Sequence, residues 1–117
     1  MEYSNRNQWQ GDGNLTRDPR METTKGGTMV AKFSIASNDI YKEQKTTSFI
    51  DCDAFGKMAE IVGGFVKGDK VYVIGKLKQQ TWEKDGEKHS KMSIMVSQVF
   101  KYPAFTRGHA EEEVPFV

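Results

Sequence analysis

The chain has 117 residues, one cysteine, and 17 lysine and arginine residues against 16 aspartate and glutamate residues, for a formal net charge of +1 at pH 7. That length predicts one domain with a hydrophobic core of its own. A single cysteine excludes an intramolecular disulfide, and no set of Cys and His residues has zinc-site spacing, so we expect no metal and no cofactor. No segment reaches the ~18 apolar residues that span a bilayer, and the N-terminal residues lack the apolar core of a signal peptide, so we expect a soluble, cytoplasmic protein.

Alternation of apolar and polar residues with a period of two predicts five strands, at residues 9–16, 29–36, 48–55, 70–82 and 91–99. The first strand contains Gly11 and Gly13, which inside a strand usually mark a bulge or a sharp bend. Between the third and fourth strands, residues 57–67 carry the apolar stripe of a short amphipathic helix, which the pair Gly63-Gly64 weakens. The stripe consists of Met58, Ile61, Val62 and Phe65.

On the second, third and fourth strands, residues of one parity suit a hydrophobic core. They are Met29, Ala31, Phe33, Ile35, Ile50, Cys52, Ala54, Val71, Val73, Gly75 and Leu77. The fifth strand is apolar on both faces, and an Asp85-Gly86 turn joins it to the fourth within a charged hairpin, residues 83–91. The order of elements predicts an all-β protein with one short helix. We expect a five-stranded OB-fold barrel (β-β-β-α-β-β) over residues 1–102, and a short linker with an acidic tail over residues 103–117.

Aromatic side chains at positions that point away from the core are the main candidates for a binding site. On the third strand, Phe49 and Phe55 share a face with Asp51 and Asp53, and on the fourth strand Trp82 shares its face with lysines. Exposed rings beside lysines are typical of a platform on which the bases of single-stranded nucleic acid stack. A dimer interface or a second small core would also use such rings, but the number of rings in this arrangement favours the platform.

Five segments follow one another along the domain: residues 14–19, 26–27, 33–36, 49–60 and 67–77, which read NLTRDP, GG, FSIA, FIDCDAFGKMAE and KGDKVYVIGKL. Together they resemble the bacterial and phage single-stranded-DNA-binding protein family, within a similarity that runs from about residue 7 to residue 99. The resemblance implies an OB barrel that assembles as a homotetramer, with a dimer as the alternative. It also implies a protein that coats single-stranded DNA during replication, recombination and repair.

The family's base-stacking aromatic residues fall on four positions that are also aromatic in this chain. The resemblance therefore implies stacking on Tyr41, Phe49, Phe55 and Trp82. Lysines near these rings are expected to contact phosphates, and they are Lys32, Lys42, Lys45, Lys57, Lys76, Lys78 and Lys84. Tyr41 lies in a polar segment with two of these lysines, which we expect to form a mobile arm.

The C-terminal segment resembles the acidic tip with which that family binds partner proteins. The residues that carry this resemblance are Glu111, Glu112, Glu113, Pro115 and Phe116, and they imply partners among replication and recombination proteins. Without the three glutamates, residues 1–110 hold 17 basic against 13 acidic residues, a net charge of +4. The near-neutral total therefore combines a basic body with an anionic segment. As an alternative to partner binding, the tail would fold back onto that body and compete with DNA.

Two features depart from the family pattern. The first strand reads Trp9-Gln10-Gly11-Asp12-Gly13 in place of a run of aliphatic residues, at the edge that often builds the dimer in that family. Asp51 and Asp53 add negative charge to the proposed DNA face, and we expect them to pair with neighbouring lysines.

Two other classes of function stay open. One is an OB-fold assembly factor in a primosome-like complex, for which DNA binding is secondary. The other is a nuclease that uses Asp51, Asp53 and a divalent metal, but two carboxylates two residues apart with no nearby histidine make a poor metal cluster. His89 and His109 lack partners for a catalytic arrangement, and Cys52 reads as a core thiol. We therefore expect a binding protein and no enzyme activity.

Overall fold

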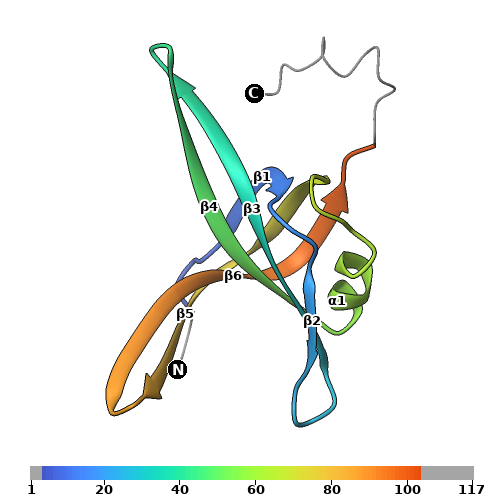
Figure 1. Cartoon of the computed structure of the whole chain (residues 1–117), viewed down its shortest axis with the longest axis vertical. Helices are drawn as coiled ribbons and strands as arrows, with labels where there is room; N and C mark the ends of the chain where they lie inside the picture. The colour runs from blue at the N-terminus through green and yellow to red at the C-terminus, as the bar shows by residue number, and fades with distance from the viewer. Residues whose placement is uncertain (1–3, 104–117) are drawn as a thin grey trace.

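The computed structural model describes residues 4–103, which form a β-barrel with two long projecting hairpins and one short helix (Figure 1). The elements are β1 (Trp9–Leu15), β2 (Arg20–Thr23), β3 (Met29–Tyr41), β4 (Gln44–Phe55), α1 (Lys57–Val62), β5 (Lys70–Lys84) and β6 (Glu87–Lys101). The strand order is β1-β5-β6-β4-β3-β2, and a second pairing of β1 with β3 closes the five long strands into a barrel. The predicted OB-fold barrel is confirmed. Within residues 4–103 the structure contains no helix with the length and hydrophobicity of a transmembrane segment.

The short strand β2 is an addition to the predicted order. It pairs with the start of β3, from Arg20 opposite Lys32 to Thr23 opposite Met29. All four of its side chains are exposed, so no alternation of apolar and polar residues marks it in the sequence. The β2–β3 turn is held by hydrogen bonds between Thr24 and Thr28, and β2 is the edge strand of the sheet beside β3.

The β3–β4 hairpin is longer than the sequence predicted. The two strands stay paired from Ser37 opposite Ser48 to Tyr41 opposite Gln44, and the connection consists of Lys42 and Glu43, with φ values of 49° and 64°. Positive φ at both central residues belongs to the tight two-residue turns whose twist suits a hairpin. The outer half of this hairpin is almost wholly exposed, so cross-strand pairing defines it without a hydrophobic face.

The barrel core contains most of the predicted inward positions. Ala31, Phe33, Ile35, Cys52, Ala54, Val71 and Val73 are all buried. Met29 and Leu77 were predicted to be buried and are exposed, because each lies where its strand leaves the barrel for a turn or hairpin. On β6 the buried side changes between Val96 and Val99, because the register shifts between Ile74 and Gly75 of β5. This bulge explains why the strand is apolar at positions of both parities.

Gly75 permits the close approach of β5 and β6 at the bulge. A Cβ atom at this position would overlap the carbonyl oxygen of Met95, which is backbone and cannot move aside. The helix α1 is shorter than predicted, since it ends at Val62 immediately before the Gly63-Gly64 pair. It buries Ala59 and Val62 against the barrel, whereas Ile61, predicted on the buried stripe, is exposed.

Candidate nucleic-acid interface

The outward row of β4 carries two aromatic rings with two carboxylates between them. Phe49 is 70% exposed and Phe55 is 41% exposed, so neither ring belongs to the core. Asp51 is also exposed, but Asp53 is only 7% exposed, although it lies on the same row. Strand alternation thus places the four side chains as the sequence predicted, and only the burial of Asp53 differs.

The outward row of β5 and β6 adjoins that of β4. Lys76, Lys78 and Trp82 lie on this row of β5, and Trp82 is 45% exposed. The amide Nε2 of Gln80, on the same row, donates a hydrogen bond to Asp53 Oδ2 at 2.6 Å, which ties the β5–β6 pair to β4. The three strands therefore present one continuous surface, which we call the stacking face, with Phe49, Phe55 and Trp82 as its exposed rings. Lys32 joins it from β3, opposite Asp53.

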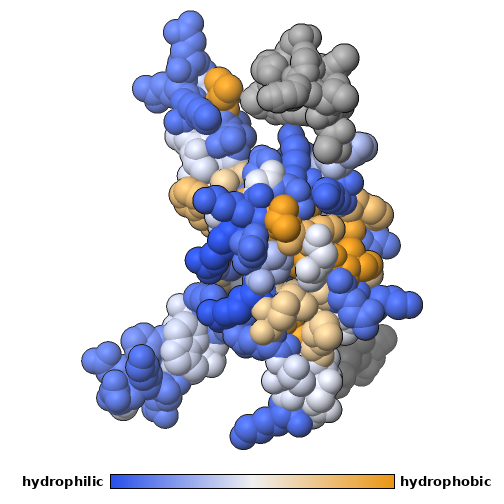
Figure 2. Space-filling model, turned by 45° about the vertical axis from the view of Figure 1, so that its right-hand side comes forward, coloured by the Kyte–Doolittle hydropathy of each residue, from blue (hydrophilic) through white to orange (hydrophobic). Residues whose placement is uncertain are grey.

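The other predicted residues lie on the projections and at the helix start. Tyr41 ends β3 at the tip of the β3–β4 hairpin, where it is 69% exposed and the Nζ atom of Lys42 lies 5.4 Å from its ring centroid. Lys45 follows on β4, and Lys84 ends β5 at the tip of the β5–β6 hairpin. Lys57 begins α1, two residues after Phe55. Figure 2 shows that the projecting hairpins are largely hydrophilic and that apolar colour gathers on the barrel between them.

A polar cleft opens beside Asp51 and Asp53, and the sequence did not predict it. Its lining consists of Arg17, Arg20, Lys32, Phe33, Asp51, Cys52, Asp53 and Lys91. Of its cations, only Lys32 was among the predicted phosphate contacts. Lys91 could have been found from the Asp85-Gly86 turn, because that turn fixes Gln80 opposite Lys91. The two arginines flank the Asp18-Pro19 turn, but only the three-dimensional fold brings them to β4.

The predicted pairing of the two carboxylates with lysines is half correct. Lys91 Nζ lies 3.5 Å from Asp51 Oδ2, which confirms the pairing for Asp51. For Asp53 the prediction is wrong, because its Oδ2 accepts hydrogen bonds from Gln80 Nε2 and, at 3.2 Å, from Ser93 Oγ. The β5–β6 pair covers the Asp53 side chain. A lysine would lose its hydration in this position, so neutral groups donate the hydrogen bonds to the carboxylate.

Cys52 lies between the two carboxylates in sequence and points into the core, where it is 1% exposed. Burial raises the pKa of its thiol to about 12, and the negative charges of Asp53 and Asp51 add to the effect. The thiol therefore stays neutral at physiological pH, as predicted for a core residue. A neutral buried thiol is neither a good nucleophile nor a metal ligand.

His89 contacts one of the proposed stacking rings. It lies opposite Trp82 on β6, and the two rings are stacked with centroids 5.6 Å apart and an interplanar angle of 21°. The imidazole packs against the indole ring, and Trp82 remains 45% exposed. A cross-strand aromatic pair of this kind also stabilises the outer part of the β5–β6 hairpin.

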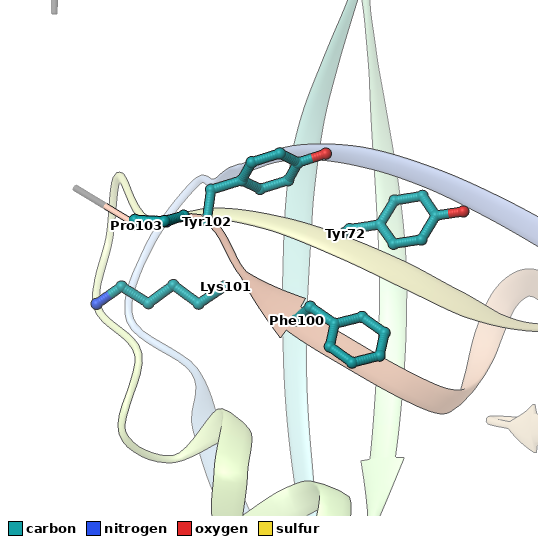
Figure 3. A pocket seen from close by; sticks show the side chains of 5 residues that line it. All are labelled: Tyr72, Phe100, Lys101, Tyr102 and Pro103. Atoms are coloured by element: carbon teal, nitrogen blue, oxygen red, sulfur yellow. The ribbon is translucent and has the colours of Figure 1, made fainter. Parts of the chain in front are cut away.

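A second aromatic cluster lies at the other end of the β5–β6 pair. Tyr72 and Phe100 stack with centroids 6.4 Å apart, and together with Lys101, Tyr102 and Pro103 they line an open apolar pocket (Figure 3). The hydroxyl of Tyr102 donates a hydrogen bond to Asp12 Oδ2 at 2.7 Å, and this bond raises the pKa of the phenol. We call this set of five pocket residues the end cluster.

The predicted partner-binding residues of the tail, Glu111, Glu112, Glu113, Pro115 and Phe116, lie outside the described residues, as does His109. The part of the chain that the structure describes ends at Pro103, in the wall of the end cluster.

Sequence and structure comparisons agree with one another. A sequence model of the Single-strand binding protein family matches residues 7–101. The chain is similar to a single-stranded DNA-binding protein of Aquifex aeolicus, with 41% identity over 113 residues, which cover 88% of this chain and 77% of that protein. It is also similar to a single-stranded DNA-binding protein of Fusobacterium nucleatum, with 35% identity over 94 residues, 75% of this chain and 61% of that protein.

The barrel also matches a solved structure described as "Plasmodium falciparum SSB complex with ssDNA". The TM-score is 0.79 at 20% sequence identity, and the match covers 88% of this chain and 100% of that chain. At this identity the match supports the fold. The chain spans between about half and three quarters of the length of the first three relatives that it matches, from 55% to 77%.

Proposed function

The chain belongs to the single-strand binding protein family, and from this membership we propose that it binds and protects single-stranded DNA, tolerant of sequence, during replication, recombination and repair. One observation carries the proposal: the stacking face presents Phe49 and Phe55 on β4 and Trp82 on β5, beside lysines. Each base that stacks on such a ring contributes roughly 1–3 kcal/mol, and any base can do so because every base has a π-face.

Ionic contacts supply the other part of the binding energy. Lys32, Lys76 and Lys78 lie on the stacking face, and Lys42, Lys45 and Lys84 lie on the two hairpins that project beside it. Each lysine that neutralises a phosphate of a single strand releases counterions, which makes the slope of log K against log salt concentration more negative by about 0.7. Binding is thus expected to weaken steadily as salt is added.

A fluorescence titration with oligo-dT tests the proposal. Stacking on Trp82 should quench its emission, and the variant Trp82→Phe separates this signal from that of Trp9 while it keeps a ring for stacking. The expected result is a saturable quench in the wild-type protein that is lost in Trp82→Phe, with little loss of affinity for labelled DNA. An absence of binding to oligo-dT at low salt would contradict the proposed function.

We further propose that the protein self-associates, as a tetramer or alternatively a dimer. Two surfaces support this proposal. The end cluster exposes apolar rings, with Phe100 53% exposed, and an exposed apolar patch is typical of a protein interface. In addition, β1 pairs with β3 only at Asn14 and Leu15, so within the described residues the edge from Trp9 to Gly13 is open to another strand. Mass measurement with and without a long oligo-dT would give the number of subunits and of nucleotides per subunit.

Partner recruitment by the acidic tail is a separate proposal that rests on its sequence. Three glutamates before Val114, Pro115 and Phe116 suit an apolar pocket with a basic rim on a replication or recombination protein. Deletion of residues 111–117 should abolish partner binding and raise affinity for single strands at low salt. If function is lost while DNA affinity and its salt dependence are unchanged, the primosome-type assembly factor is the better interpretation.

We propose a binding protein that acts in the cytoplasm and has no nuclease activity. The support is chemical: Asp53 accepts hydrogen bonds from Gln80 and Ser93, and Asp51 faces Lys91, so their Oδ2 atoms are already engaged. Incubation of end-labelled single strands with the protein and magnesium should leave them intact. Cleavage that disappears in Asp51→Asn would reverse this interpretation.

A further inference from the structure

Two carboxylates lie in the middle of a face proposed to bind a polyanion. Phe49 and Phe55 are six residues apart on β4, a separation of roughly 20 Å along a strand. That is farther than two adjacent bases reach, so a strand that stacks on both rings carries other bases past Asp51 and Asp53. Negative charge here repels phosphates, so the carboxylates weaken the binding that the surrounding lysines provide.

The cleft beside these carboxylates has the composition of a nucleotide site. Arg17, Arg20, Lys32 and Lys91 line it together with the two carboxylates. Arg20 pairs with Glu22 at 2.8 Å and Lys91 with Asp51, so within the described residues Arg17 and Lys32 are the two cations of the cleft without an ion pair. The cations attract a phosphate, whereas the carboxylates can only accept hydrogen bonds and therefore need an N–H or O–H group as partner. A nucleotide offers both partners, since its phosphate is anionic and its base carries N–H groups.

Asp53 is held in a fixed position with one oxygen left for a ligand. Gln80 Nε2 and Ser93 Oγ both donate to Oδ2, at 2.6 Å and 3.2 Å, and within residues 4–103 no group donates to Oδ1. No buried side-chain oxygen or nitrogen of the described residues lacks a partner, so Oδ1 is not sealed away from solvent. Asp53 lines the cleft, so a donor that enters the cleft can approach this carboxylate.

Asp51 is the more accessible of the two carboxylates. Its side chain is 48% exposed, and its ion pair with Lys91 spans 3.5 Å. Exposed pairs of this length contribute about 0–1 kcal/mol, so a ligand donor competes with the lysine at low cost. Lys91 would then be released towards the phosphate of the same nucleotide.

We propose that this cleft reads the exocyclic amino group of one base, and so discriminates cytosine, adenine and guanine from thymine at that position. Thymine is the one DNA base without such a group, and its single N–H donor lies between two carbonyl oxygens that the carboxylates repel. The stacking rings remain indifferent to base identity, so the discrimination is a local preference within sequence-tolerant binding. This inference rests on the proposed function, because it requires a single strand on the stacking face.

The test compares oligo-dC with oligo-dT of equal length, by competition against one labelled strand, in the full-length protein. Asp51→Asn and Asp53→Asn remove the negative charge with little change in shape, and the asparagine amide adds a donor that thymine accepts. The variants should bind both strands more tightly, but the affinity ratio of dC to dT should fall about fivefold. That factor corresponds to roughly 1 kcal/mol, the lower end for a specific base contact.

Asp39→Asn is the matched control, since Asp39 lies on the β3–β4 hairpin, is exposed and does not line the cleft. It loses the same charge and should leave the dC to dT ratio unchanged. Asp51→Asn removes only an exposed pair, so its result stands even if Asp53→Asn is less stable to heat. Equal changes for dC and dT in Asp51→Asn would overturn the inference while DNA binding stands. If the wild-type protein binds neither strand, the proposed function itself is wrong.

Discussion

Exposed aromatic rings occur at both ends of the β5–β6 pair, in different electrostatic settings. Near the hairpin turn, Trp82 shares its row with Lys76 and Lys78, which make no ion pair within the described residues. At the other end, Tyr72 stacks on Phe100, and Lys101, which lines the pocket, pairs with Asp69 at 3.5 Å. Ring exposure alone therefore does not identify a nucleic-acid interface. Rings beside unpaired cations favour DNA, and rings beside neutralised charges favour protein.

The largest expected effect comes from removing two rings of the stacking face together. Phe55→Ala with Trp82→Ala should weaken binding of labelled oligo-dT by roughly 2–6 kcal/mol, because each lost stack costs about 1–3 kcal/mol. Fluorescence anisotropy of the labelled DNA measures this without any need for protein emission. The matched variant Tyr72→Ala, from the end cluster, should retain the DNA affinity of each subunit. Wild-type affinity in the double variant would remove the distinction between the two clusters.

The end cluster should instead control self-association. Phe100→Ala truncates a 53% exposed ring that stacks on Tyr72, and loss of a central aromatic residue at an interface typically costs about 2 kcal/mol or more. Sedimentation at several protein concentrations should show a shift to smaller species. Phe49→Ala, an equally large truncation on the stacking face, is the control and should not change the mass. If both variants dissociate equally, the stacking face is itself part of an interface.

Each of the two regions contains a group with a raised pKa, the thiol of Cys52 and the phenol of Tyr102, but the causes differ. The pKa of Cys52, beneath the stacking face, is raised to about 12 chiefly by burial, whereas the pKa of Tyr102 is raised by its hydrogen bond to Asp12. The pKa of Cys52 is thus higher in the folded protein than in the unfolded chain, where it is near 9. The free energy of unfolding therefore keeps its full value below pH 9 and decreases as the pH rises from 9 towards 12. At pH 10 the loss should be roughly 1 kcal/mol.

Chemical denaturation at pH 8 and pH 10 measures this loss. Cys52→Ala should be less stable at both values because of the cavity, but its pH dependence should be smaller than that of the wild-type protein. Other tyrosines and lysines titrate in the same range in both proteins, so the difference between them isolates the thiol. Identical pH dependence would show that Cys52 ionises in the folded state.

Sequence patterns were sufficient to predict the features that depend on residues within a single strand or turn. Alternation on β4 placed Phe49 and Phe55 outside the core and Cys52 inside it, and the Asp85-Gly86 pair located the β5–β6 turn. These features depend on residues two apart or on a two-residue turn, which a single sequence displays directly.

The features that the sequence did not reveal depend on contacts between distant segments. Asp53 is buried because Gln80, 27 residues later, and Ser93, 40 residues later, cover and bind it. The cleft cation Arg20 meets β4 because the exposed strand β2 pairs with β3, and Arg17 follows Thr16, whose backbone N–H donates a hydrogen bond to Ser34 of β3. No local period encodes either contact, and so the site for one base edge became visible only in the folded barrel.

The smallest predicted effect concerns single lysines and refines the contrast between the two ends. Lys78→Ala should lower the binding free energy by less than about 1 kcal/mol at moderate salt. The slope of log K against log salt concentration should nevertheless become less negative by about 0.7, the amount for one phosphate. Lys101→Ala carries the same charge change to the end cluster, where Asp69 already neutralises the lysine, so its slope should match that of the wild-type protein. Titrations from low to high salt with one oligo-dT length measure both slopes. Equal reductions in the two variants would mean that the strand continues past the β5–β6 bulge and that the end cluster is part of its path.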